Sequence, residues 1–322
     1  MSRNPKILVI RFSSIGDIIL TTPLIRCLKH QIDAEIDFLT KSNYQDLIIS
    51  NPNISEVITF STFPKTIDVL KSKKYDFVID LQNNFRSLRI RSLLTVKSYT
   101  FSKNNFRRYI LIYFGINLLN NHIVDRYFKS VEELNISNDN QGIDYFISNK
   151  NLKIDFNTDQ EYICWCIGGT YEQKKLSVMQ ITNVISKMEL PILFIGGESE
   201  KKISSQIINS MKCNNVSDLC GETSIDESAY LIKKSKLVLT NDTGMMHIAS
   251  AFDIPIISFW GCTKPSLGFS PYQANVKSET IITELSGRPC SKHGKYCRFQ
   301  SDGCIKEIDE DIIINTVTRL LK

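Results

Sequence analysis

Two short segments of this 322-residue chain carry residues that could bind a phosphate group and transfer what is attached to it. One segment, Asn241-Asp-Thr-Gly-Met-Met-His247, follows the apolar run Leu237–Leu239. A buried strand that turns directly into a helix presents free backbone N–H groups and the positive end of the helix dipole, and both favour a phosphate. His247 falls on the first turn of that helix and can point back at the same place. The pattern is equally that of an ordinary loop in which Asp242 or Thr243 caps the helix.

The other segment, Arg11-Phe-Ser-Ser-Ile-Gly-Asp17, follows the apolar run 7–10 and leads into a helix. Gly16 permits a close approach of the backbone to a ligand or a positive φ. Two roles are open for Asp17. As a helix cap it stabilises the helix by about 1 kcal/mol. As a general base it deprotonates an acceptor hydroxyl, an effect on the order of a hundredfold or more. The segment lacks the glycines of a dinucleotide fingerprint and the Gly-Lys-Ser/Thr of a P-loop, which disfavours a dehydrogenase or a P-loop NTPase.

The elements that position these segments alternate between short apolar runs and helical patterns, which predicts parallel sheets covered on both faces. We expect strands at 7–10, 36–39, 57–60, 77–81, 98–101, 162–167, 191–195, 216–219, 237–240 and 256–259, helices at 18–29, 44–50, 66–73, 85–94 and 309–321, and a mainly helical stretch at 105–135. The Asn-rich stretch 135–160 is the natural linker. The prediction is therefore an α/β protein with two doubly wound, Rossmann-like domains, 1–155 and 156–322. They would face each other across a cleft, with ligands at the carboxyl ends of the strands.

The distribution of charge favours an anionic partner for the first half of the chain. No acidic residue lies between Asp80 and Asp125, whereas seven basic residues do: Arg86, Arg89, Arg91, Lys97, Lys103, Arg107 and Arg108. No motif for RNA or DNA binding accompanies them, so we expect no nucleic-acid partner. No apolar run reaches membrane-spanning length, and a strand begins at once after the N-terminus. We expect a cytoplasmic protein that could lie on the inner face of the cytoplasmic membrane.

The nine cysteines are odd in number, and six of them sit singly or in apolar contexts, as reduced core thiols do. Cys290, Cys297 and Cys304 recur at seven-residue intervals near His293. The short Cys-x₂₋₄-Cys spacing of structural zinc is missing, so local packing or a reduced surface loop is favoured over a metal site. Whether these three cysteines bind a metal stays open.

With both motifs in view, the chain resembles glycosyltransferase family 9, the bacterial lipopolysaccharide heptosyltransferases. The residues that carry the resemblance are Arg11 to Asp17, Asp80-Leu-Gln-Asn-Asn-Phe-Arg-Ser87, Gly196-Gly197, Leu219-Cys-Gly-Glu-Thr223, Asn241 to His247 and Phe259-Trp-Gly-Cys-Thr-Lys-Pro265. It implies a GT-B fold, with the acceptor bound mainly by the N-terminal domain and a nucleotide-sugar donor mainly by the C-terminal domain. The implied reaction transfers a heptose from ADP-heptose to a core oligosaccharide with inversion and needs no metal or other cofactor.

The resemblance also assigns roles to residues. Asp17 would be the general base, and Lys174 would contact the donor phosphates, with Lys175 as the alternative. The diphosphate would be surrounded by Asp242, Thr243, Gly244 and His247. The residues expected to face the acceptor, an anionic glycolipid or oligosaccharide, are Ser13, Ser14, Gly16, Gln82, Asn83 and Arg86.

Two departures from the family pattern are Leu176-Ser177, where many members have Trp-Pro, and Cys262, where Pro is common. The alternatives are a transferase of the same family that uses another nucleotide sugar and a catalytically idle module that binds nucleotide or glycan.

Overall fold

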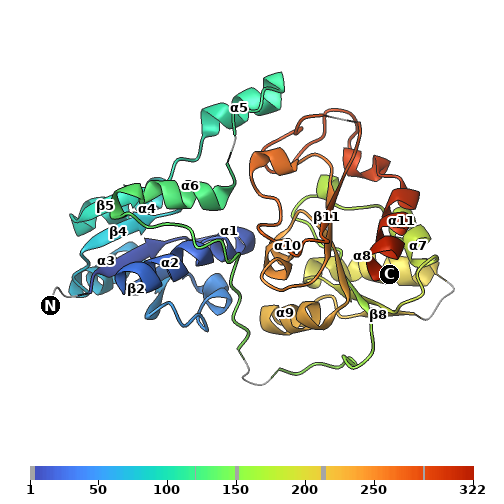
Figure 1. Ribbon diagram of the computed structural model, residues 1–322, viewed down its shortest axis with the longest axis horizontal. Helices are drawn as coiled ribbons and strands as arrows, with labels where there is room; N and C mark the ends of the chain where they lie inside the picture. Colours follow the sequence, from blue (N-terminus) through green and yellow to red (C-terminus); the bar gives the residue numbers. More distant parts are fainter. Residues whose placement is uncertain (1–3, 120, 149–151, 212–214, 286) are drawn as a thin grey trace. The chain divides into compact units, whose positions relative to one another are not determined.

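The computed structural model describes residues 4–119, 121–148, 152–211, 215–285 and 287–322. The chain forms two compact units, one comprising Met1–Asn104 and Asn121–Ser148 and the other Asn105–Asn120 and Asn149–Lys322. Each unit is built on one parallel β-sheet that carries helices, as Figure 1 shows. The prediction of an α/β protein with two parallel sheets is confirmed.

The sheet of the first unit has the strand order β3-β2-β1-β4-β5, and every neighbouring pair is parallel. Its strands are β1 (Lys6–Ile10), β2 (Glu35–Lys41), β3 (Glu56–Phe60), β4 (Phe77–Asp80) and β5 (Lys97–Thr100). Its helices are α1 (Ile15–Ile19), α2 (Thr22–Ile32), α3 (Phe63–Ser72), α4 (Phe85–Leu94) and α6 (Ile123–Ser130), with 3₁₀ turns η1 (Ser42–Leu47) and η2 (Glu132–Leu134). The strand order reverses between β1 and β4. Ligands of doubly wound sheets bind at this point, outside the carboxyl ends of the strands.

The sheet of the second unit has the order β11-β10-β9-β6-β7-β8 and reverses between β6 and β9. Its strands are β6 (Ile163–Cys166), β7 (Ile192–Ile195), β8 (Val216–Asp218), β9 (Leu237–Asn241), β10 (Ile256–Trp260) and β11 (Glu279–Ile282). Its helices are α5 (Asn105–Phe114), α7 (Val178–Ile185), α8 (Lys201–Ser210), α9 (Ile225–Lys234), α10 (Gly244–Ala249) and α11 (Glu310–Leu321), with 3₁₀ turns η3 (Glu172–Lys174), η4 (Glu198–Glu200), η5 (Pro265–Leu267) and η6 (Cys304–Glu307).

Alternate side chains of the central strands of this second sheet enter two separate apolar cores. Ile163 and Trp165 of β6 belong to a core with residues of α7, α8 and α11, whereas Cys164 and Cys166 belong to a core with residues of α9 and α10. Because successive side chains of a strand point to opposite faces, both faces of the sheet are covered. The same burial on two faces explains why the strands are visible in the sequence as continuous apolar runs.

The structure differs from the predicted elements at three places. The helix expected at 44–50 is the 3₁₀ helix η1 (Ser42–Leu47), followed by a turn. The helix expected at 18–29 is two helices, since α2 begins anew at Thr22 with Pro23 in its first turn. Proline has no backbone N–H and a fixed φ, so it suits the start of a helix and not its middle. The edge strand β11 was not predicted, because Ile281 is its only buried residue.

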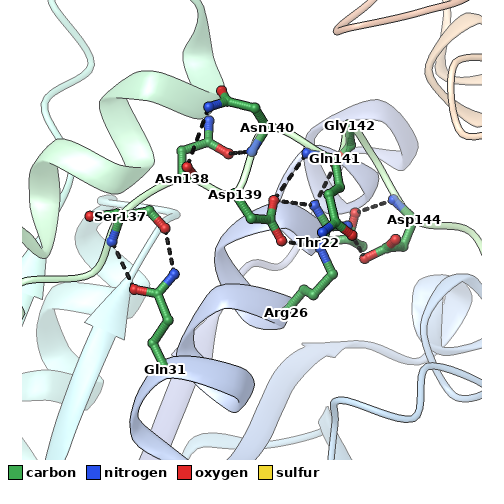
Figure 2. A network of polar contacts seen from close by, with 10 residues as sticks. All are labelled: Thr22, Arg26, Gln31, Ser137, Asn138, Asp139, Asn140, Gln141, Gly142 and Asp144. Atoms are coloured by element: carbon green, nitrogen blue, oxygen red, sulfur yellow. Dashed lines mark hydrogen bonds and ion pairs between the residues drawn. The ribbon is translucent and has the colours of Figure 1, made fainter.

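The first part of the Asn-rich stretch that was predicted as a linker is fixed to the first unit by a polar network (Figure 2). The guanidinium of Arg26, on α2, donates to both carboxylate oxygens of Asp139, at 2.7 and 2.8 Å, and to the carbonyl of Gly142 at 3.0 Å. Its third nitrogen lies 2.5 Å from the carboxylate of Asp144. The hydrogen bond from Arg26 lowers the pKa of Asp139 to about 2. Residues 139–144 therefore belong to the packed structure of this unit.

Helix α5 belongs to the second unit, although its sequence lies within the expected first domain 1–155. Leu111 and Leu119 are buried against Leu267, and the side chains of Arg298 and Arg288 donate to the carbonyl oxygens of Ile112 and Tyr113. The compact units therefore divide the chain differently from the expected 1–155 and 156–322. Among the described residues, no helix has the length and apolar character needed to cross a membrane.

Candidate active site

The carboxylate of Asp17 lies at the start of α1, in the loop that leaves β1. It accepts hydrogen bonds from the backbone N–H of Ser14 at 3.2 Å and from the Ser14 hydroxyl at 2.9 Å. Its other oxygen lies 2.8 Å from Nη2 of Arg11, and the side chain keeps 24% of its exposure to solvent. Asp17 therefore takes part in capping α1 and still presents an accessible carboxylate, so the two roles suggested by the sequence do not exclude each other.

The surroundings of Asp17 keep it ionised. Burial by itself would raise the pKa of this carboxyl, but the positive charge of Arg11 and the hydrogen bonds from Ser14 outweigh burial and hold the pKa below its usual value. An ionised carboxylate at neutral pH is the form that can accept a proton.

Arg11 links the loop after β1 to the loop after β4. Its side chain is buried and donates to the carbonyl of Ser13 at 2.9 Å and to the carbonyl of Leu81. In the same region the side-chain oxygen of Gln82 accepts a hydrogen bond from the backbone N–H of Phe12 at 2.8 Å. The structure thus brings together the two segments that were predicted to face the acceptor. Arg11 was not predicted as a site residue, although it stands at the head of the motif.

The other residues predicted to contact the acceptor differ in how exposed and how constrained they are. Asn83 has a positive φ of 46°, and its side chain donates to the carbonyl of Phe101 at 3.0 Å. Arg86 lies over the rings of Phe12 and Phe60, 5.5 and 4.9 Å from their centroids. Gly16 is buried inside α1 with an ordinary negative φ, so the positive φ considered for it does not occur. Ser14 is exposed and Ser13 is half-buried.

In the second unit, the two segments predicted to bind the donor meet at one ion pair. Nζ of Lys174, at the end of η3, lies 2.7 Å from Oδ2 of Asp242, which follows β9. The hydroxyl of Thr263 donates to the same oxygen at 2.7 Å. The side-chain amide of Asn241 donates to the carbonyls of Ile167 and Gly168, at 3.1 and 2.9 Å, and ties the end of β9 to the loop after β6.

The two candidate lysines have different partners. Lys175 lies 2.9 Å from Glu172 and 3.4 Å from Glu200, away from the turn after β9. Burial would lower the pKa of Lys175, but these two carboxylates outweigh burial and raise it. Lys174 contacts Asp242 of the predicted phosphate-binding turn, so the geometry favours Lys174 over Lys175 as the donor-binding lysine.

The turn itself has a polar group without a protein partner. Thr243 is the N-cap of α10, and its hydroxyl oxygen is buried with no hydrogen-bond partner among the described residues. Gly244 is the first residue of the helix and is half-buried. His247 is the fourth residue of α10 and only 4% exposed. A ligand at this turn would supply an acceptor for the Thr243 hydroxyl and for the first N–H groups of the helix.

The three cysteines that recur at seven-residue intervals lie together with a fourth, Cys262. Cys262 directly precedes Thr263, whose hydroxyl donates to Asp242 of this turn. The four Sγ atoms all lie within 4.8 Å of one another. Cys290 and Cys304 are buried, so they do not lie in an exposed loop, whereas local packing, the other arrangement that the sequence favoured, is compatible with their burial. Sequence spacing could not reveal Cys262, because it precedes the repeat by 28 residues.

Comparisons with known proteins agree with the motifs. The family model described as glycosyltransferase family 9 (heptosyltransferase) matches residues 65–298. Lipooligosaccharide heptosyltransferase 2 of Campylobacter jejuni is 22% identical, over 96% of this chain and 96% of that protein.

Two solved structures give the fold. A family 9 glycosyl transferase from Veillonella parvula has a TM-score of 0.80 at 20% identity and covers 99% of this chain and 97% of its own. The ADP-heptose lps heptosyltransferase II of Escherichia coli has a TM-score of 0.75 at 20% identity, covering 98% of both chains. The predicted GT-B fold, with two Rossmann-like domains, is confirmed.

Proposed function

Because this chain belongs to glycosyltransferase family 9 and is a heptosyltransferase-type enzyme, we propose that it transfers a heptose from ADP-heptose to the core of a lipopolysaccharide or a related surface glycan. The relatives that match nearly the whole chain are lipopolysaccharide or lipooligosaccharide heptosyltransferases, and the similar enzyme of Escherichia coli is named for ADP-heptose. The observation that carries the proposal is the pairing of Lys174 with Asp242 at the carboxyl ends of β6 and β9, where a doubly wound sheet binds its ligand.

In the proposed reaction, Asp17 is the general base. The acceptor hydroxyl gives its proton to the Asp17 carboxylate, and its oxygen attacks the anomeric carbon of the donor. The bond from that carbon to the phosphate oxygen breaks on the opposite side, and ADP leaves. The sugar is therefore transferred with inversion in a single displacement. The low pKa of Asp17 keeps the carboxylate ready to accept the proton at neutral pH.

The leaving diphosphate gains negative charge as the bond breaks. The ammonium of Lys174 and the N–H groups at the start of α10 would stabilise that charge in the transition state. Asp242 and Thr263 hold the Lys174 side chain in place before the donor binds. His247 would complete the surroundings of the diphosphate. Since these groups supply the positive charge, the proposed chemistry does not require a divalent metal ion.

On the acceptor side, Ser13, Ser14, Gly16, Gln82, Asn83 and Arg86 would contact an anionic glycolipid or oligosaccharide. We also propose that the enzyme works in the cytoplasm and binds the inner face of the cytoplasmic membrane. Helix α5 supports this, because Phe106 is 75% exposed and Phe114 is 66% exposed on a segment that also carries Arg107. Exposed aromatic and basic side chains together favour an anionic lipid surface.

The test is a transfer assay with purified protein, ADP-heptose and lipopolysaccharide that lacks its heptoses, read by mass spectrometry of the acceptor. We expect the acceptor to gain the mass of one heptose, with release of ADP. Product from another nucleotide sugar, and none from ADP-heptose, would favour the alternative donor. Binding of ADP without transfer from any donor would mean an idle binding module.

A further inference from the structure

Four cysteine side chains from three separate segments of the second unit converge on one point. Cys262 lies in the loop after β10, Cys290 and Cys297 lie in the loop after β11, and Cys304 begins η6. All four Sγ atoms lie within 4.8 Å of one another, with 3.6 Å between Cys262 and Cys304 and 4.0 Å between Cys290 and Cys297. All four are free thiols.

These separations are those of a tetrahedral metal site. A zinc ion bound by four thiolates at about 2.3 Å places each pair of sulfurs about 3.8 Å apart. A disulfide would require the two sulfurs to be about 2.05 Å apart. Cys262, Cys290 and Cys304 are fully buried, and Cys297 is half-buried. We propose that these four cysteines form a closed structural zinc site.

The backbone around the cluster is arranged to support bound sulfurs. The N–H of Phe299 donates to Sγ of Cys297 at 3.5 Å. Hydrogen bonds to the ligand atoms are a general feature of protein metal sites, where they orient the ligands and stabilise their charge.

The chain also makes a close backbone approach that brings two of the sulfurs together. A Cβ atom on Gly261 would lie 2.5 Å from Cβ of Ile305, so only glycine fits beside η6. Gly261 directly precedes Cys262, and Ile305 directly follows Cys304. The glycine therefore allows the loop after β10 to reach η6 at the distance that a shared ion requires.

A buried lysine lies two residues from one of the four cysteines. Lys264, two residues after Cys262, is 4% exposed, and its Nζ donates to the carbonyl oxygen of Thr283 at 3.0 Å. Four thiolates around one zinc ion carry a net charge of −2. A lysine ammonium near the site would offset part of that charge.

The zinc ion would be structural because the four cysteines leave no position for water or substrate. Tetrahedral sulfur sites also accept iron, so the experiment must identify the metal. It therefore leaves the proposed transfer reaction aside and measures the metal directly.

The experiment determines the metal content of the full-length protein, purified without added metal, by inductively coupled plasma mass spectrometry. We expect one zinc ion per chain. We also expect a mercurial reagent that modifies four thiols to release this zinc ion, which a zinc-sensitive dye detects. Cys297→Ser is expected to lower the zinc content strongly. The control Cys27→Ser, at a buried cysteine of α2, is expected to retain it.

Because the Cys297 variant could fail to fold, a second measurement uses the unchanged chain. After removal of the metal, Co²⁺ is added, and a tetrahedral tetrathiolate site gives intense visible absorption that zinc abolishes. Zinc-free protein with four reactive thiols or with disulfides among these cysteines would overturn the proposal. Stoichiometric iron in place of zinc would overturn it as well.

Discussion

The ammonium of Lys174 lies 2.7 Å from the carboxylate of Asp242, and this contact joins the loop after β6 to the turn after β9. The next residue, Lys175, instead pairs with Glu172 and Glu200. The two adjacent lysines therefore have different partners: Lys174 contacts the turn after β9, and Lys175 contacts carboxylates of η3 and η4.

The first prediction concerns this pair of lysines. Lys174→Ala should raise the dissociation constant of ADP by about tenfold or more, because a hydrogen bond to a charged group contributes about 1.5–3 kcal/mol. Lys175→Met is the matched control and should leave ADP binding nearly unchanged. Isothermal titration calorimetry with ADP measures both. Equal losses in the two variants would contradict the assignment of Lys174.

The second prediction concerns Asp17. Asp17→Asn keeps the shape of the side chain but cannot accept a proton, so the transfer rate should fall by about a hundredfold or more. Binding of ADP should stay close to that of the unchanged enzyme. Single-turnover kinetics and calorimetry separate the two quantities. A variant that keeps most of its turnover would show that another group is the base.

The third prediction is a shift in the dependence of the transfer rate on pH. The ion pair with Arg11 helps to hold the pKa of Asp17 below its usual value. The unchanged enzyme should therefore lose activity only as the pH falls through that low pKa. Arg11→Met removes the pair, which raises the pKa of Asp17 and should move the acidic limb of the kcat/KM profile to higher pH. If the acidic limb of the kcat/KM profile does not move in a folded Arg11→Met variant, Arg11 does not control the pKa of Asp17.

The fourth prediction concerns the stability of the first unit at low pH. Arg26 lowers the pKa of Asp139 to about 2, below the value of about 3.9 for an unfolded chain. The pair therefore contributes its full stability above about pH 4 and loses it as the pH falls through about 2. Asp139→Asn should have a lower free energy of unfolding at neutral pH and a shallower loss of stability between these limits.

Urea denaturation at several pH values measures this effect, with Asp159→Asn, at an exposed position, as the control. Arg26→Ala should be more damaging at neutral pH, by about 3 kcal/mol or more, because it leaves Asp139 and Asp144 without their cation. Parallel profiles for Asp139→Asn and the unchanged protein would refute the role of the pair.

The fifth prediction concerns Gly294, which contacts Lys174. Its φ is +78°, and a Cβ atom there would lie 2.6 Å from Cγ of Lys174. Gly294→Ala should lower the free energy of unfolding by about 1 kcal/mol or more, from backbone strain alone, and should weaken ADP binding by displacing Lys174. In Gly287→Ala, the matched control for stability, the added methyl group meets no atom within 4 Å. Equal stability of both variants would contradict the close packing described here.

Much of the fold could be predicted from the sequence because buried parallel strands appear as apolar runs. Strand β9 (Leu237–Asn241), for example, is buried at every position. The turn after it was readable because polar and small residues follow at once. Two features could not be read in this way. The edge strand β11 buries only Ile281, and Leu111 of α5 meets its partner Leu267 across more than 150 residues of sequence. Neither leaves a local pattern.

The candidate site shows the same division. The sequence motifs predicted Asp17, Lys174 and Asp242 as site residues. Asp17 pairs with Arg11 of its own motif, and Lys174 and Asp242 pair with each other. Thr263 and Cys262 were not predicted as site residues. They lie in the loop after β10, and their partners, Asp242 for Thr263 and the other three cysteines for Cys262, are distant in the sequence.

The placement of α5 means that the polypeptide passes from one unit to the other three times, at residues 104–105, 120–121 and 148–149. A fragment ending at residue 148 would carry this helix without Leu267, leaving Leu111 and Leu119 uncovered. A fragment beginning at residue 149 would lack the carbonyl groups that Arg288 and Arg298 bind. The two units are therefore built from alternating segments of the chain, and cutting the chain once would not yield two complete units.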